Sequence, residues 1–218
     1  MGLLQYGLME SIVIIDYGAG NLRSVQKAFE HLGHPAVISD DPAVVAEAPA
    51  LVFPGQGASP PAMTTLNSNG MADAIRKAIS EDKPFFGVCL GLQLLVERSE
   101  EGDTACLGVL PGTTKLLPAG LKVPHMGWNS VHVNCSHPLF ENVAQDSYFY
   151  FVHSYYATPE DPEVVLGTTE YGIDFCSVAV HGNLVATQFH PEKSGPVGLQ
   201  LYDNFVRRLV YREAASSA

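Results

Sequence analysis

The most informative stretch of the chain is Phe85-Phe86-Gly87-Val88-Cys89-Leu90-Gly91-Leu92-Gln93. Its apolar beginning predicts a buried strand over residues 85–88, and residues 90–98 predict a helix that starts directly after Cys89. Glycine stands two positions before and two positions after the cysteine. This is the spacing of a nucleophile elbow, a strained strand-to-helix turn in which larger neighbouring side chains would collide with the backbone. The stretch therefore predicts that Cys89 is a nucleophile.

The position of Cys89 also predicts how its thiol is activated. Unpaired N–H groups and the dipole at the start of a helix favour a thiolate. The backbone N–H of Leu90 is then placed to donate to an oxyanion. The other cysteines, at positions 106, 135 and 176, lack the glycine bracket, and we interpret them as structural thiols.

Strands and helices alternate on both sides of this elbow. Before it, residues 12–16, 36–39 and 50–53 read as strands, and residues 22–32 and 71–79 read as helices. After it, strands predominate over residues 131–134, 147–156, 164–169, 175–181 and 184–189, and a last helix covers 197–211. This order predicts one α/β domain over residues 11–213, with a parallel sheet, an N-terminal extension over 1–10 and a C-terminal tail over 214–218.

Composition limits the classes of partner. Apolar residues make up 46% of the chain and charged residues 16%, below the roughly 25% of an average soluble domain, as a buried parallel sheet requires. The net charge of −11 argues against nucleic acid or an anionic membrane as the main partner. The cysteines show neither a CxxC pair nor zinc-ligand spacing, and no apolar run approaches the roughly 18 residues of a membrane span. We expect a cytoplasmic protein with free thiols, no metal and no cofactor.

A cysteine nucleophile needs a base that later acts as an acid toward the leaving group. His190 follows the predicted strand 184–189 directly, at the sheet edge where open α/β folds bind ligands. Glu192, two residues further on, is placed to fix the tautomer of the imidazole. His153, within another predicted strand, is an equal candidate, and the spacing of these residues leaves both open.

These motifs resemble a known family. The segments 87–93 and 188–192 resemble the class I (triad) glutamine amidotransferases, which have a flavodoxin-like fold with an additional antiparallel strand region. Four more segments resemble one branch of that family, the glutaminase subunits of imidazole glycerol phosphate synthase. These are Asp16-Tyr17-Gly18-Ala19-Gly20-Asn21-Leu22, Pro124-His125-Met126-Gly127-Trp128-Asn129, Tyr150-Phe151-Val152-His153-Ser154-Tyr155 and His190-Pro191-Glu192-Lys193-Ser194.

The resemblance implies roles for particular residues. It implies Cys89 as the nucleophile, His190 as base and acid, and Glu192 as the residue that orients His190, so it favours His190 over His153. It further implies an oxyanion hole at Gly55 and Leu90, and glutamine-binding residues at Gly57, Gln93, Ser154 and Tyr155. The surface that would meet a (βα)8-barrel cyclase in a heterodimer comprises Asn21, Trp128, Tyr150 and Lys193. Two positions depart from the family pattern, since Gln56 replaces valine and Leu92 replaces methionine.

The implied reaction is hydrolysis of glutamine to glutamate and ammonia, with the ammonia passed to the cyclase in histidine biosynthesis. Three alternatives stay open at this point. One is a glutaminase that serves another acceptor, as in anthranilate or pyridoxal phosphate synthesis, although Trp128 within its segment argues against it. The second is a stand-alone cysteine hydrolase, and the third is a catalytically silent binding subunit.

Overall fold

The computed structural model describes residues 11–213, so the expected extension and tail lie outside the described residues. Its main sheet has eight strands in the order β2-β1-β3-β4-β14-β13-β12-β9. The strands are β1 Ile12–Ile15, β2 Ala36–Ser39, β3 Leu51–Gly55, β4 Phe85–Cys89, β9 His132–Val133, β12 Val165–Glu170, β13 Asp174–His181 and β14 Leu184–Thr187. The first five strands in this order, β2, β1, β3, β4 and β14, pair in parallel. The last three, β13, β12 and β9, continue the sheet with antiparallel pairing. The predicted α/β class, with a mostly parallel sheet and an antiparallel region, is confirmed.

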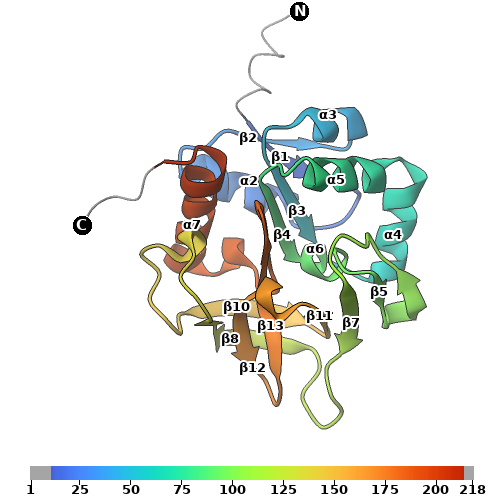
Figure 1. Ribbon diagram of the computed structural model, residues 1–218, viewed down its shortest axis with the longest axis vertical. Helices are drawn as coiled ribbons and strands as arrows, with labels where there is room; N and C mark the ends of the chain where they lie inside the picture. The colour runs from blue at the N-terminus through green and yellow to red at the C-terminus, as the bar shows by residue number, and fades with distance from the viewer. Residues whose placement is uncertain (1–10, 214–218) are drawn as a thin grey trace, which may run out of the picture.

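Helices cover both faces of this sheet (Figure 1). One face carries α2 (Leu22–His31) and α7 (Gly195–Asn204), which continues as the π-helical segment η5 (Phe205–Val210). The other face carries α3 (Pro42–Glu47), α4 (Ser59–Ser68) and α5 (Met71–Ser80). The strands are apolar on both faces because each face packs under its own layer. In β1, Val13 and Ile15 join one core cluster, while Ile12 and Ile14 join the other.

Two smaller sheets extend the carboxyl end of the main sheet and form the lower part of the molecule in Figure 1. One pairs β8 (His125–Ser130) with β10 (Tyr148–His153). The other contains β11 (Tyr155–Pro159), β7 (Gly112–Leu116), β5 (Arg98–Ser99) and β6 (Thr104–Ala105). Single turns of 3₁₀ helix lie at η1 (Glu101–Asp103), η2 (Pro138–Phe140), η3 (Pro162–Val164) and η4 (Pro191–Lys193).

Two of the predicted elements are wrong in extent. The helix after Cys89, α6, covers Leu90–Gln93 and does not reach Arg98. Residues 94–96 are fully buried, and their carbonyls accept from the N–H groups of residues 107–110, so they pair with another segment instead of continuing the helix. The strand predicted over 147–156 is two strands, because the chain leaves β10 at Ser154 and enters a different sheet as β11.

Other elements were missed by the sequence analysis. Helix α3 is short, and its signals are Asp41, which accepts from the N–H of Ala43, and Pro42 in its first turn. Helix α4 and strands β7 and β8 were also missed. In β8, buried and exposed residues alternate only weakly, so the sequence shows little of the two-residue periodicity that predicts a strand. Within residues 11–213, no helix has the length and apolarity needed to cross a membrane.

Candidate active site

Cys89 lies on a strained turn between β4 and α6, with φ of 55° and ψ of −106°. The glycines around it are required by close packing. A Cβ at Gly91 would stand 2.1 Å from the carbonyl oxygen of Phe53, and one at Gly87 would stand 3.0 Å from the Cβ of Ala186. The elbow predicted from the sequence is therefore present. Since α6 has only one turn, its dipole is a weaker source of thiolate stabilisation than the sequence implied.

The sulfur of Cys89 contacts two groups from other strands. The side-chain amide of Gln188 donates to Sγ at 3.7 Å, and the carbonyl oxygen of Val152 lies 3.9 Å away. Gln188 is itself held in place, because its Oε1 accepts from Nε2 of Gln93 at 3.1 Å. Gln188 was not among the predicted site residues. Its signal in the sequence is a polar residue at the carboxyl end of an apolar strand, two positions before His190.

His190 and Glu192 form a buried pair. Nδ1 of His190 lies 2.9 Å from Oε1 of Glu192, and both side chains are 2% exposed. Nδ1 donates to the carboxylate, which leaves Nε2 to exchange a proton with the substrate or the sulfur. Burial opposes a charge on the ring, but the thiolate of Cys89 and the carboxylate of Glu192 outweigh it and raise the pKa of His190 to about 10. His190 thus favours its protonated form.

The turn that carries this pair is fixed to β10. The backbone N–H of His190 donates to the carbonyl oxygen of Tyr150 at 2.9 Å. The hydroxyl of Ser194 donates to the carbonyl oxygen of His190 at 2.7 Å and accepts from the N–H of Tyr150 at 3.0 Å. Because β4 and β14 are adjacent in the sheet, Cys89 and His190 emerge side by side at its carboxyl edge.

His153, the alternative base, is committed to another network. Its Nδ1 donates to the carbonyl oxygen of Tyr155 at 2.9 Å, and its Nε2 accepts from Nδ1 of His125 at 3.1 Å. Nε2 of His125 in turn lies 3.4 Å from the amide of Asn129. Burial lowers the pKa of His153 to about 3, so the ring is neutral with both nitrogens used. The geometry therefore favours His190 as the base.

A pocket of about 410 Å³ opens beside the sulfur. Most of the residues expected at the site line it, namely Gly57, Cys89, Leu90, Gln93, Ser154, Tyr155, His190 and Lys193. Gln56, one of the two departures from the family pattern, also lines it. The amide of Gln93 donates to the carbonyl oxygen of Tyr155 at 2.7 Å and to Gln188, so it shapes the wall and has both N–H donors used within the protein.

Gly55 and Glu192 lie behind the pocket wall. Gly55 pairs with Cys89 across β3 and β4, and a Cβ there would stand 2.7 Å from both the Cβ of Leu90 and the hydroxyl of Tyr17. A side chain at Gly55 would therefore displace the elbow. Glu192 reaches the pocket only through His190.

Glu101 lines the pocket and was not predicted from the sequence. Its Oε2 accepts from the backbone N–H of Ser59 at 2.7 Å, which anchors the carboxylate at the pocket wall. In the sequence Glu101 is one of several acidic residues in the segment 97–103, and nothing there distinguishes it from a solvated charge. Only the tertiary structure brings it to the pocket.

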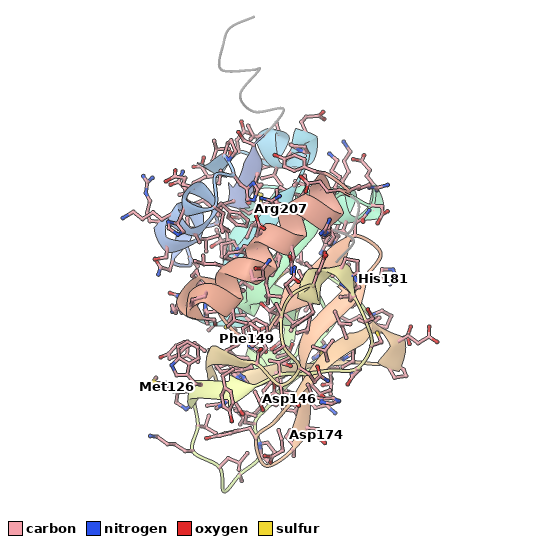
Figure 2. The ribbon with its side chains drawn as sticks, turned by 90° about the vertical axis from the view of Figure 1, so that its left-hand side faces the viewer. Met126, Asp146, Phe149, Asp174, His181 and Arg207 are labelled. Atoms are coloured by element: carbon pink, nitrogen blue, oxygen red, sulfur yellow. The ribbon has the colours of Figure 1, made fainter. Side chains whose placement is uncertain are left out.

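Of the four residues expected at a partner surface, Lys193 is the one that lines the pocket. Trp128 is 54% exposed and pairs with Tyr150 across β8 and β10, with ring centroids 6.1 Å apart. Asn21 lies at the start of α2. Its neighbour Gly20 packs near the carbonyl oxygen of Pro54, because a Cβ at Gly20 would stand 3.6 Å from that atom. Exposed Met126 and Tyr148 extend the same strand pair, and Figure 2 shows Met126 at the outer edge of the molecule.

In the part of the chain that the structure describes, the cysteines and acidic groups form no metal centre. All four cysteines are free thiols. Among residues 11–213, no three side chains of His, Cys, Asp or Glu gather in a way that would hold a metal ion.

Comparisons with known proteins identify the family. A family model described as "Glutamine amidotransferase class-I" matches residues 13–209. The imidazole glycerol phosphate synthase subunit HisH of Moorella thermoacetica is 51% identical over 198 residues, covering 90% of this chain and 94% of that protein. The subunit of the same name from Dehalococcoides mccartyi is 47% identical over 197 residues, covering 90% of this chain and 96% of that protein.

Solved structures share the fold at low identity. The structure of PurLQS from Thermotoga maritima superposes with a TM-score of 0.73 at 19% identity, over 92% of this chain and 100% of that chain. The crystal structure of a glutamine amidotransferase superposes with a TM-score of 0.69 at 22% identity, over 91% of this chain and 98% of that chain.

Proposed function

This chain belongs to the class I glutamine amidotransferase family, and we propose that it is the glutaminase subunit of an imidazole glycerol phosphate synthase. It hydrolyses glutamine to glutamate and ammonia and supplies the ammonia to a cyclase subunit. The observation that carries this proposal is the meeting of Cys89 with the buried His190–Glu192 pair at one pocket, where neighbouring charge outweighs burial and raises the pKa of His190 to about 10.

The first half of the reaction forms a thioester. The thiolate of Cys89 attacks the side-chain amide carbon of glutamine, and the carbonyl oxygen becomes an oxyanion. Backbone N–H groups at Leu90 and at the turn after Gly55 stabilise it, each such donor contributing about 3 kcal/mol in comparable sites. Protonated His190 gives its proton to the amide nitrogen, the C–N bond breaks, and ammonia leaves. Glu192 holds the ring so that Nε2 faces the reacting atoms.

The second half restores the enzyme. His190, now neutral, accepts a proton from water, and the hydroxide attacks the thioester carbon. The C–S bond then breaks, glutamate leaves, and the thiolate forms again beside protonated His190. The charge of that thiolate is one of the causes that raise the pKa of His190, which favours this resting state.

The pocket has groups suited to the α-carbon end of glutamine. Its anchored Glu101 carboxylate attracts an α-ammonium group, and this residue joins Gly57, Ser154 and Tyr155 as the proposed binding set. The neutral wall near His153 adds no competing charge.

A partner follows from the chemistry of the product. Free ammonia in water at neutral pH takes up a proton and loses its nucleophilic lone pair, so it must pass directly to an acceptor site. The exposed aromatic face of β8 and β10 adjoins the pocket through Val152, which lines it. Exposed aromatic residues of this kind are typical of protein interfaces. We assign this face, with Asn21 and Lys193, to a (βα)8-barrel cyclase in a cytoplasmic heterodimer.

Replacing the nucleophile tests the proposal. Cys89→Ala is expected to abolish glutamine-dependent activity of the reconstituted synthase, while the cyclase remains able to use added ammonium salt. Cys135→Ala is the matched control, because this exposed thiol lies away from the pocket and its loss should leave turnover unchanged. Glutamate release and cyclase product are measured for each variant. Glutamine hydrolysis by Cys89→Ala at the wild-type rate would overturn the proposal.

A further inference from the structure

Two buried polar atoms behind the His190–Glu192 pair have no hydrogen bond of normal geometry. They are the hydroxyl oxygen of Tyr202 and Oε2 of Glu192, and neither has such a partner among residues 11–213. Tyr202 is fully buried on α7, and Glu192 is buried on η4. A buried carboxylate oxygen without a hydrogen-bond donor costs more folding free energy than most buried unsatisfied polar groups. Native proteins keep few such atoms, and those that remain often have a functional role.

The packing of α7 brings these two groups toward each other. At Gly198 the helix presses on the η4 turn so closely that a Cβ would stand 2.0 Å from the carbonyl oxygen of Pro191 and 2.8 Å from the Cβ of Ser194. Tyr202 follows Gly198 by four residues, so it lies on the same face of the helix one turn later. The face that meets η4 is therefore the face that carries Tyr202.

The ring of Tyr202 is held firmly in this position. Its centroid lies 4.5 Å from that of Phe29 and 5.2 Å from that of Phe86. The pKa of Tyr202 is raised well above its usual range, mainly by burial. The charge of Glu192 and a side-chain interaction between Tyr202 and Glu192 raise it further. The hydroxyl therefore keeps its proton and is within electrostatic reach of the carboxylate.

We propose that Tyr202 is a positioning residue, whose hydroxyl donates to Oε2 of Glu192 and so holds the carboxylate in the orientation that fixes His190. The inference rests on the proposed function, because it concerns the same triad. The carboxylate of Glu192 then accepts from two donors, the hydroxyl of Tyr202 at Oε2 and Nδ1 of His190 at Oε1. Tyr202 touches neither substrate nor sulfur and acts through Glu192.

The test compares Tyr202→Phe with the wild-type chain in the reconstituted synthase. The substitution removes one oxygen and keeps the packed ring. We expect kcat for glutamine hydrolysis to fall about tenfold, as for loss of a hydrogen bond to a buried charged group, with KM for glutamine unchanged. In the isolated chain, the NMR titration midpoint of His190 should fall, because a loosened Glu192 supports the imidazolium less.

Two further variants separate positioning from packing. Phe29→Leu disturbs the ring that packs on Tyr202 but keeps the hydroxyl, so it should lower the melting temperature with kcat close to wild type. In a Glu192→Ala background the effect of Tyr202→Phe should disappear, because its target is gone. A purely structural role would lower activity equally in both backgrounds.

The outcomes keep the two proposals apart. If wild type hydrolyses glutamine, Cys89→Ala does not, and Tyr202→Phe matches wild type in kcat and in the His190 titration, the positioning role is overturned and the glutaminase assignment stands. If the wild-type synthase fails to hydrolyse glutamine, the glutaminase assignment falls. The His190 titration in the isolated chain then still decides whether Tyr202 supports the pair.

Discussion

At His190, burial and charge act in opposite directions, and charge prevails. Burial disfavours the imidazolium, while the ionised Cys89 and Glu192 stabilise it, so the pKa rises from the usual 6.5 to about 10. The folded protein then binds this proton more tightly than the unfolded chain does. The resulting stabilisation is fully present below pH 6.5 and is lost as the pH rises toward 10.

Cys89→Ala tests this linkage. Without the thiolate charge, only Glu192 opposes the effect of burial, so the pKa of His190 should lie below its wild-type value. The loss of stability between pH 6.5 and pH 10 should then be smaller than in wild type. Urea unfolding across that pH window measures the free energy of unfolding for both proteins. An equal loss of stability in the variant would mean that the sulfur does not hold the proton on His190.

At the scale of elements, the elbow depends on how closely α6 approaches β3. A Cβ at Gly91 would stand 2.1 Å from the carbonyl oxygen of Phe53, a backbone atom that cannot move without shifting the strand. Gly91→Ala should therefore lower the free energy of unfolding by about 3 kcal/mol or more and remove glutaminase activity. Chemical denaturation and turnover assays measure the two effects.

Gly33→Ala is the matched control at this scale. Gly33 has a φ of +81° after α2, but nothing lies within 4 Å of its would-be Cβ. The cost is then the strain of the left-handed backbone, about 1 to 2 kcal/mol, with kcat retained. If both variants lost equal stability and both kept activity, the close approach at the elbow would not matter for the site.

At the scale of the whole molecule, the exposed aromatic face at the pocket mouth should dominate association with the cyclase. Trp128→Ala is expected to weaken binding by about 2 kcal/mol, as for a central aromatic anchor of an interface. It should leave the melting temperature nearly unchanged, because Trp128 is 54% exposed. Calorimetric titration of the two subunits measures the affinity.

Tyr211→Ala provides the control for this surface. Tyr211 is 51% exposed and follows the π-helical end of α7, next to His34 and away from β8. Its removal should not change the affinity for the cyclase. Wild-type affinity in Trp128→Ala, or an equal loss in Tyr211→Ala, would place the docking surface elsewhere.

Much of the fold could be predicted from the sequence because strands, turns and elbows depend on neighbours along the chain. The family model and the relatives confirm the family and the glutaminase assignment, and the shared fold confirms the α/β class. The errors fall where long-range pairing overrides local pattern. Residues 94–96 continue a helical pattern but pair with residues 107–110, and the run 147–156 divides at Ser154 between two sheets.

The sequence by itself determined the elbow at Cys89, because the glycines that its close packing requires are near neighbours of Cys89 along the chain. Which groups surround that sulfur was decided only by the tertiary structure. Gln188 lies 99 residues away in the chain and reaches Sγ because β14 pairs with β4. Packing between distant segments also brings His125 to His153, Glu101 to the pocket, and α7 against the turn that carries Glu192. Spacing along the chain does not encode such packing.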